Sequence, residues 1–303
     1  MEGGIIEKKQ IALACRLDSE RAIKLAKRIF EFLVQKGEIV ALETRIAPKI
    51  FPHNGMDLSE MTEENIKFIV IIGGDGSVLR VANSLTQKEP PPILGVNVGS
   101  IGFLDESNDR TIFKDLTRAL NGDFEYEICS KITPYIVKNS DEIRLTDALN
   151  EVLIVSSKSS KVLQVSIRID NVFLNRSYLD GVLISTSTGS TAYNLSAGGA
   201  IVNPNLEVMQ ITPLNSFAGS GLKPIIVSLD SVVEIQLLRP RLDAKIVIDG
   251  QNIIERIAPN TKIRIRKSNT KNKFIRFGRS YYSRLRKKII GTVRVPLDDS
   301  PEE

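Results

Sequence analysis

The chain has 303 residues, 42% hydrophobic and 25% charged, with a formal net charge of +5, values typical of a globular protein large enough for two domains. Its two cysteines (Cys15 and Cys129) exclude a disulfide scaffold or a cysteine-ligated zinc site, and its one histidine, His53 in a turn-like stretch, argues against a Ser-His-Asp triad or a histidine metal site. Because no apolar run of about 18 residues and no signal-peptide core is found, we expect a cytoplasmic protein without a membrane span.

Charge is unevenly distributed along the chain. Residues 256–297 contain 14 Lys or Arg and no Asp or Glu, so the remainder is net negative. Such a segment suits a nucleic acid, a phosphorylated ligand or an acidic partner. However, the alternation of basic and apolar residues at 262–266 favours a strand with a solvated basic face, and we expect no nucleic-acid partner.

The first 122 residues alternate between predicted strands and helices. Short apolar strands are predicted at 11–17, 39–42, 68–72 and 93–97, and helices at 19–36, from the glycine turn to about residue 85, and at 111–120. This order predicts a Rossmann-like parallel α/β domain, in which ligands bind beyond the carboxyl ends of the strands. Two glycine loops, 73–77 and 99–102, fall at that edge.

After residue 123 the pattern changes to short runs with period-two character. These predict a C-terminal antiparallel β-sandwich domain over 123–277, with a tight hairpin at Asp170-Asn171. A helix is expected after Ser190 and another at 281–290. The predicted strands cover 135–138, 143–149, 152–156, 162–170, 172–176, 181–185, 224–228, 232–238, 245–248, 263–266 and 274–277.

The loop Gly73-Gly74-Asp75-Gly76-Ser77 carries the clearest chemical signal. Three glycines let the backbone approach a phosphate closely, and the following helix offers free N–H groups and the positive end of its dipole. Asp75 would repel a phosphate at this place. It therefore performs chemistry, or it holds a hydroxyl or a metal.

A second group of polar residues comes from Asn150-Glu151 and from the Ser/Thr/Gly-rich segment 180–199. Hydroxyls at this density suit a ligand rich in sugar hydroxyls and ring nitrogens. A capped helix start followed by a tightly packed helix of small residues would explain the same pattern.

Taken together, these segments resemble the NAD kinase family in order and approximate spacing. The resemblance rests on 73–77, 95–104, Asn150-Glu151 and 180–199, and it covers about residues 66–251. The long second motif is specific, whereas the short motif is also similar to those of phosphofructokinases and of diacylglycerol and sphingosine kinases. Because residues 277–288 are similar to the family's end, we expect 278–303 to pack back on the first domain (1–122), and 123–277 to form the NAD-binding domain.

The resemblance also implies roles for individual residues. Asp75 matches the base that acts on the 2′-hydroxyl of the adenosine ribose of NAD, and Asp180 matches a contact on the nicotinamide side, reaching across a subunit interface. The other implied NAD or NADP contacts are Gly74, Gly76, Asn150, Glu151, Ser187, Thr188, Thr191, Ala192, Tyr193 and Ser196. Candidate contacts to the donor or its phosphates are Ser77, Arg80, Lys223, Asp249 and Gln251.

Three positions depart from the family pattern. Ser77 replaces a more frequent threonine and keeps the hydroxyl. Residues 212–216 lack the histidine of many members, so no imidazole acts there. Lys223 stands where an arginine is common and keeps the charge without the bidentate fork.

We therefore expect phosphoryl transfer from ATP, another nucleoside triphosphate or polyphosphate to NAD, giving NADP. No cage of carboxylates is evident, so no protein metal site is expected, and Mg²⁺ or another divalent cation would arrive with the donor. The resemblance further implies a homodimer or homotetramer. Two rival functions stay open: a lipid or sugar kinase of the same superfamily, and a non-enzymatic dinucleotide sensor or nucleic-acid binder that uses the basic segment.

Overall fold

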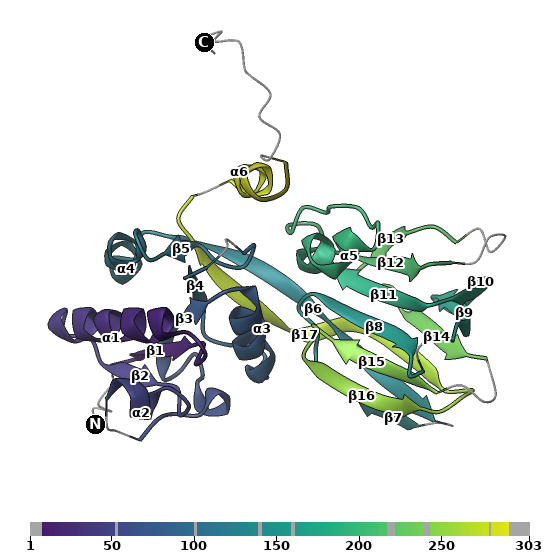
Figure 1. The fold of residues 1–303 in the computed structure, drawn as a ribbon, viewed down its shortest axis with the longest axis horizontal. Helices are drawn as coiled ribbons and strands as arrows, with labels where there is room; N and C mark the ends of the chain where they lie inside the picture. Colours follow the sequence, from purple (N-terminus) through teal and green to yellow (C-terminus); the bar gives the residue numbers. More distant parts are fainter. Residues whose placement is uncertain are drawn as a thin grey trace, which may run out of the picture.

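The structure is a computed structural model that describes residues 8–51, 54–99, 102–138, 141–158, 161–216, 222–238, 243–278 and 280–290. His53 lies outside the described residues. The chain forms an α/β half and a β-rich half, which two long strands, β6 (Glu125–Lys138) and β17 (Lys262–Arg276), run between (Figure 1). No helix in the described ranges is long and apolar enough to cross a membrane.

The α/β half is built on four parallel strands in the order β4 (Ile93–Asn97), β3 (Ile66–Gly73), β1 (Gln10–Cys15) and β2 (Val40–Leu42). The helices are α1 (Glu20–Gln35), α2 (Ala47–Ile50), α3 (Asp75–Ser84) and α4 (Ile112–Leu120), with a 3₁₀ turn at Leu58–Glu60 and a two-residue strand β5 (Ser107–Asn108). The Ser19 hydroxyl caps α1 by accepting from the Ala22 amide, and Gly37 ends it in the left-handed conformation. The predicted parallel α/β domain is confirmed.

The β-rich half is a sandwich of two sheets. A six-stranded antiparallel sheet has the order β13 (Ile225–Ser228), β12 (Val208–Leu214), β11 (Gly181–Thr186), β8 (Glu151–Ser156), β15 (Ala244–Ile248) and β16 (Asn252–Ile257). It packs on the other end of the large sheet, which contains β6, β7 (Asp141–Arg144), β9 (Leu163–Ile169), β10 (Val172–Leu179), β14 (Val233–Leu237) and β17. Asp170 and Asn171 both have positive φ, as a type I′ hairpin requires.

Several predicted elements differ from the structure. The segments 263–266 and 274–277 are parts of one strand, β17, which stays paired with β6 across a bulge between Lys267 and Lys271. Residues 145–149 are not in a strand, whereas the structure adds β12 and β16, which were not predicted. Pro213 interrupts the strand pattern of β12. The helices expected after Ser190 and at 281–290 are only a 3₁₀ turn with α5 (Tyr193–Ser196), and α6 (Tyr281–Leu285) with a π turn (Arg286–Ile290).

The basic residues of β17 face acidic side chains from elsewhere in the chain. Arg264 pairs with Glu142 and Glu234, and Lys273 bonds Glu63 and Glu89 at 2.7 and 2.8 Å. The apolar residues between them, such as Ile263, are buried in the sandwich. Much of the charge asymmetry of the sequence is thus neutralised within the molecule.

Candidate functional site

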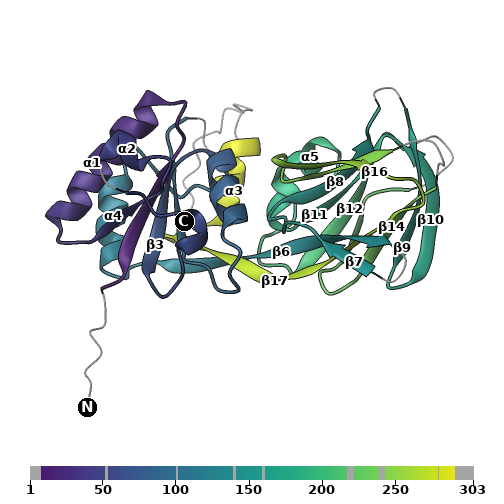
Figure 2. The same cartoon turned by 90° about the horizontal axis from the view of Figure 1, so that it is seen from below.

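The glycine-rich loop joins β3 to α3 on the side of the α/β half that faces the β-rich half (Figure 2). Gly74 is the N-cap in an extended conformation, and Asp75 is the first residue of α3. A Cβ on Gly73 would lie 2.3 Å from the Ser77 Oγ, so the turn can close this tightly only with glycine there. The loop therefore presents the helix N-terminus and the Asp75 carboxylate together, as the sequence predicts.

Asp75 is held by the second glycine loop. Its Oδ2 accepts from the Phe103 amide at 2.8 Å, and its Oδ1 accepts from the Leu104 amide at 3.0 Å. A Cβ on Gly102 would lie 1.9 Å from Oδ1, so this approach requires glycine. The two loops at the carboxyl ends of β3 and β4 thus fix the orientation of one carboxylate.

Asp105 is a neighbour of Asp75 that the sequence did not single out. Burial, and then the charge of Asp75, raise the pKa of Asp105 to about 6. Its Oδ2 accepts from the Asn97 side chain at 2.6 Å. The signal that could have found Asp105 is its place in the loop after β4, at the edge where ligands bind.

Three arginines surround the glycine-rich loop. A pocket of about 400 Å³ is lined by Arg16, Arg45 and Arg80 together with Gly74, Gly76 and Ser77. Arg80 forms two hydrogen bonds to the buried Glu43, at 2.6 and 2.8 Å. Arg80 and Ser77 were predicted as donor contacts, whereas Arg16 and Arg45 were missed, although each follows the end of a parallel strand.

Asp249 connects α3 to the Asn150-Glu151 pair. Its carboxylate accepts from the backbone amides of Leu149, Asn150 and Glu151 at 2.8 to 2.9 Å and from the Asn83 side chain of α3 at 3.0 Å. Asp249 was predicted as a contact to the donor phosphates. With 4% exposure and four internal donors, it instead joins the two halves of the protein.

Gln251 and Glu151 extend this junction. The Gln251 side chain donates to the Gly76 carbonyl at 2.8 Å, so its amide, predicted as a donor contact, is engaged with the glycine-rich loop itself. Glu151 is buried, and its Oε2 has no partner among the described residues. Burial, and then the charge of Asp249, raise the pKa of Glu151 to about 8. At neutral pH Glu151 therefore carries a proton that it can donate.

Most hydroxyls of the segment 185–196 are used inside the protein. The Thr186 Oγ1 donates to the Leu149 carbonyl at 2.6 Å, and the Ser187 hydroxyl donates to the Leu206 carbonyl. The hydroxyl density that suggested a sugar ligand therefore has largely a structural cause here, and this includes Ser187. The predicted residues that remain accessible are Thr188, Thr191, Ala192, Tyr193 and Ser196.

Asp180 and Lys223 are not brought to the glycine-rich loop. Asp180 directly precedes β11, whereas Thr186 ends that strand six residues later, roughly 20 Å away at about 3.3 Å per residue. The exposed Asp180 carboxylate accepts from the Asn215 side chain at 2.8 Å. Lys223 is exposed just before β13, which pairs with β12 near the same end.

Within the described part of the chain, no group of three or more His, Cys, Asp or Glu side chains is placed to hold a metal ion. The arrangement combines an oriented carboxylate, a helix N-terminus, an arginine-lined pocket and a proton-bearing glutamate. Such a set can bind phosphates and accept a proton from a hydroxyl.

Comparison with known proteins agrees with this chemistry. Residues 11–124 match the family model described as the ATP-NAD kinase N-terminal domain, and residues 149–277 match the ATP-NAD kinase C-terminal domain. The chain is 35% identical to the NAD kinase of Methanothermobacter thermautotrophicus, covering 93% of this chain and 96% of that protein. It is 37% identical to the NAD kinase of Methanopyrus kandleri, with 92% and 97% coverage.

Two solved structures share the fold. The NAD kinase from Archaeoglobus fulgidus in complex with ATP superposes with a TM-score of 0.70 at 29% identity, covering 93% of this chain and 97% of that one. Yeast NADH kinase complexed with NADH gives a TM-score of 0.81 at 20% identity, covering 95% of this chain and 89% of that one, and supports the fold alone.

Proposed function

This chain belongs to the NAD kinase family, and we propose that it transfers a phosphoryl group from ATP to the 2′-hydroxyl of the adenosine ribose of NAD, giving NADP. The observation that carries this function is the Asp75 carboxylate, oriented by two backbone amides at the start of α3. Through Asp249, α3 is joined to the backbone of Asn150 and Glu151.

In the proposed mechanism Asp75 accepts the proton of the ribose hydroxyl as that oxygen attacks the terminal phosphorus. The bond to the leaving nucleoside diphosphate breaks, and the diphosphate keeps the electron pair. The N–H groups at the start of α3 and the nearby arginines stabilise the charge that develops on the phosphoryl oxygens. Asn150, Glu151 and the accessible residues of the segment 188–196 hold the dinucleotide.

We propose that Mg²⁺ has no protein site of its own, which is supported by the lack of any group of three or more His, Cys, Asp or Glu side chains placed to hold a metal ion among the described residues. A divalent cation would enter as part of the donor complex, bound mainly by phosphates and water.

The reaction is tested by incubation with NAD, Mg²⁺ and either ATP or polyphosphate, followed by an NADP-specific readout. Asp75→Asn should remove nearly all turnover and leave the affinity for NAD within a few-fold, because only proton transfer is lost. Asp141→Asn, in an exposed strand remote from the loop, is the control and should match the wild type. Near-full activity of Asp75→Asn would exclude the general-base role, and activity on diacylglycerol or fructose 6-phosphate without activity on NAD would favour the rival kinase function.

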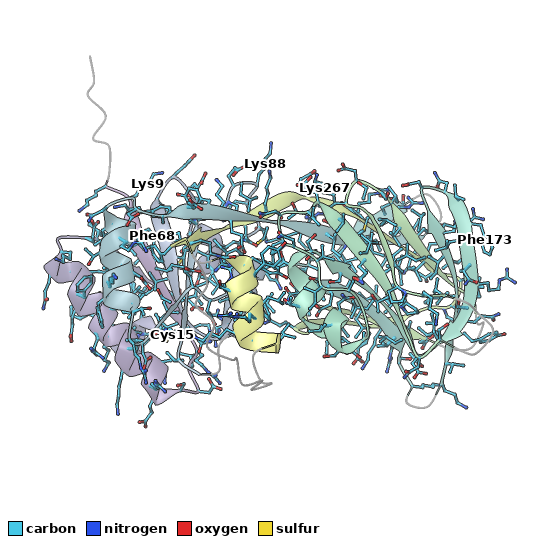
Figure 3. All side chains as sticks on the ribbon, turned by 90° about the horizontal axis from the view of Figure 1, so that it is seen from above. Lys9, Cys15, Phe68, Lys88, Phe173 and Lys267 are labelled. Atoms are coloured by element: carbon cyan, nitrogen blue, oxygen red, sulfur yellow. The ribbon has the colours of Figure 1, made fainter. Side chains whose placement is uncertain are left out.

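We also propose that the protein acts as a homo-oligomer in which Asp180 serves a neighbouring copy. The edge strand β10 exposes Val172, Phe173 and Leu174, and Phe173 lies at the end of the molecule farthest from the α/β half (Figure 3). Exposed apolar residues on an edge strand favour contact with another copy. Asp180 follows directly after this strand.

A complementation experiment tests this arrangement. In a mixed oligomer of Asp75→Asn and Asp180→Asn chains, one kind of site combines an intact Asp75 with an intact Asp180 from its neighbour. Activity should therefore return on co-refolding the two inactive variants. If Asp180 acts within its own subunit, mixing restores nothing, and if Asp180 has no role, Asp180→Asn is active by itself. Either result, or a monomer in sedimentation, would contradict the proposal.

A further inference from the structure

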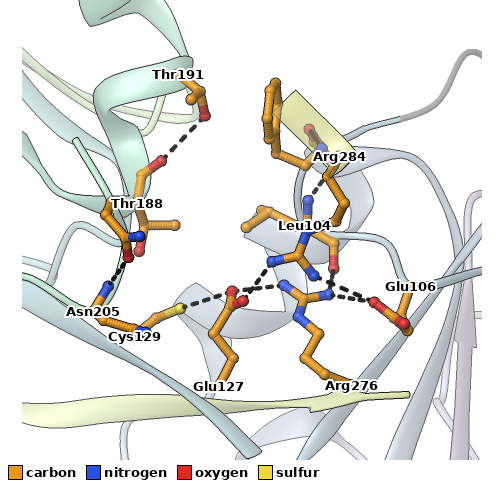
Figure 4. Close-up of polar contacts among 12 residues, drawn as sticks. Leu104, Glu106, Glu127, Cys129, Thr188, Thr191, Asn205, Arg276 and Arg284 are labelled. Carbon is orange, nitrogen blue, oxygen red and sulfur yellow. Dashed lines mark hydrogen bonds and ion pairs between the residues drawn. The ribbon is translucent and has the colours of Figure 1, made fainter. Parts of the chain in front are cut away.

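The described end of the chain is anchored beside the glycine loops by a buried ion-pair network. Arg276 of β17 and Arg284 of α6 both bond Glu127, Arg276 at 2.8 Å and Arg284 at 2.5 Å, and both also pair with Glu106 (Figure 4). Glu106 lies in the loop after β4, three residues beyond Phe103. The network therefore ties α6 and the following turn to the loop that holds Asp75.

Lys288 lies in that turn and has an unusual environment. Its Nζ is buried and has no hydrogen-bond partner among the described residues. The ammonium sits 4.0 Å from the centre of the Phe103 ring, and the amide of Phe103 is the donor to Asp75. The Asp105 Oδ1 is also buried without a described partner, and both residues line one pocket of about 620 Å³.

A purely structural role is a poor explanation for this lysine. A contact to an aromatic ring is only weakly favourable and does not offset the cost of burying an ammonium without a hydrogen-bonded partner. Burial lowers the pKa of Lys288 to about 8, while the Asp75 and Asp105 carboxylates oppose this and Arg284 and Arg276 add to it. The fold thus keeps a destabilising buried cation within electrostatic reach of the Asp75 carboxylate, which is characteristic of functional groups.

We propose that Lys288 is a catalytic residue whose ammonium binds a phosphate oxygen of the substrates beside Asp75. This inference rests on the proposed phosphoryl transfer. As the ribose oxygen bonds to phosphorus and the leaving diphosphate departs with its electron pair, the hydroxyl proton passes to Asp75. Lys288 stays protonated throughout and donates hydrogen bonds to the phosphoryl oxygens, where negative charge develops.

The substitutions Lys288→Met and Lys288→Arg separate charge from packing. Methionine keeps an apolar stem over Phe103 without the charge, and we expect kcat to fall about 10²-fold with the KM for NAD within a few-fold. Arginine keeps the cation and should recover most of the loss. Arg286→Met removes an exposed cation from the same turn, and its kcat and KM for NAD should equal those of the wild type. Near-wild-type kcat in Lys288→Met would overturn the inference.

The pH profile gives a readout that a structural role would not move. In the wild type, kcat should decline above about pH 8 as Lys288 loses its proton. In Lys288→Arg that alkaline decline should disappear or move upward, because arginine stays charged. An unchanged alkaline limb in Lys288→Arg would contradict the proposal.

A binding measurement is independent of turnover. Inorganic triphosphate should bind Lys288→Met at least tenfold more weakly than it binds the wild type or Arg286→Met, and equal binding would count against Lys288 as a phosphate ligand. If the wild type makes no NADP, the proposed function fails. If the wild type is active and Lys288→Met equals it, only the present inference fails.

Discussion

Gly102 lies so close to Asp75 that any side chain would displace the catalytic carboxylate. Because a Cβ would come within 1.9 Å of the Asp75 Oδ1, we expect Gly102→Ala to lower kcat by at least tenfold, by misplacing a reacting group. Steady-state kinetics with NAD and ATP measure this effect. Gly99→Ala, in the same loop with open space around it, is the matched control. Equal kcat for both variants would show that the Asp75 position is not sensitive to this contact.

Glu151 makes stability depend on pH. Its folded pKa of about 8 lies above the ordinary glutamate value of 4.5, so at pH values between these two the folded protein holds a proton that the unfolded chain has released. Stability conferred by this proton is therefore lost as the pH rises from about 4.5 to 8. The glutamine side chain of the Glu151→Gln variant does not ionise. The melting temperature of this variant should therefore lie a few °C above that of the wild type at pH 8, and the two melting temperatures should be equal near pH 4.5. Melting curves at both pH values decide this, with the exposed Glu255→Gln as control.

At the scale of elements, α3 is held along its length by the β-rich half. Gln251 bonds its first turn, Asn83 near its end bonds Asp249, and the Lys131 ammonium donates to the Ala82 carbonyl at 2.9 Å. The helix that carries Asp75 is therefore positioned by residues that are distant in sequence. This explains how the two halves place Asp75 relative to Asn150 and Glu151.

Asp249→Asn tests the joint between these elements. The amide nitrogen would face backbone N–H donors, so at least one buried donor would lose its acceptor, at a cost of about 1–3 kcal/mol. We expect a lower denaturation midpoint together with a reduced kcat, since α3 loses its fixed position. Asp141→Asn should alter neither quantity. A stable and fully active Asp249→Asn would show that the joint is dispensable.

At the scale of the whole molecule, β6 and β17 make two halves share one sheet. The predicted domain boundary after residue 122 falls just before β6. The first residues of β6 pair with the end of β17, next to the α/β half, and the last residues of β6 pair with the start of β17 inside the sandwich. β17 returns the chain to the α/β half, and this places Arg276, Arg284 and Lys288 next to the glycine loops.

Removing divalent cations with a chelator tests whether such a cation serves the donor phosphates or the stability of the fold. EDTA should abolish NADP formation, because the donor phosphates need a divalent cation, and should leave the melting temperature within about 1 °C, because no described side chains form a metal cluster. Excess Mg²⁺ should restore activity. A marked fall in melting temperature with EDTA would reveal a structural metal.

The amino-acid sequence alone determined the local features. The parallel α/β order, the glycine-rich turn around Asp75 and the Asp170-Asn171 hairpin depend on periodicity, caps and glycine within a few residues, so one-dimensional patterns predict them. The tertiary structure decided which polar groups serve the fold and which face the site. Asp249, Ser187 and Gln251 bond other parts of the protein, while Arg16, Asp105 and Lys288 lie beside the glycine loops. These outcomes depend on contacts between residues far apart in sequence, set by the course of β17, and no local pattern encodes them.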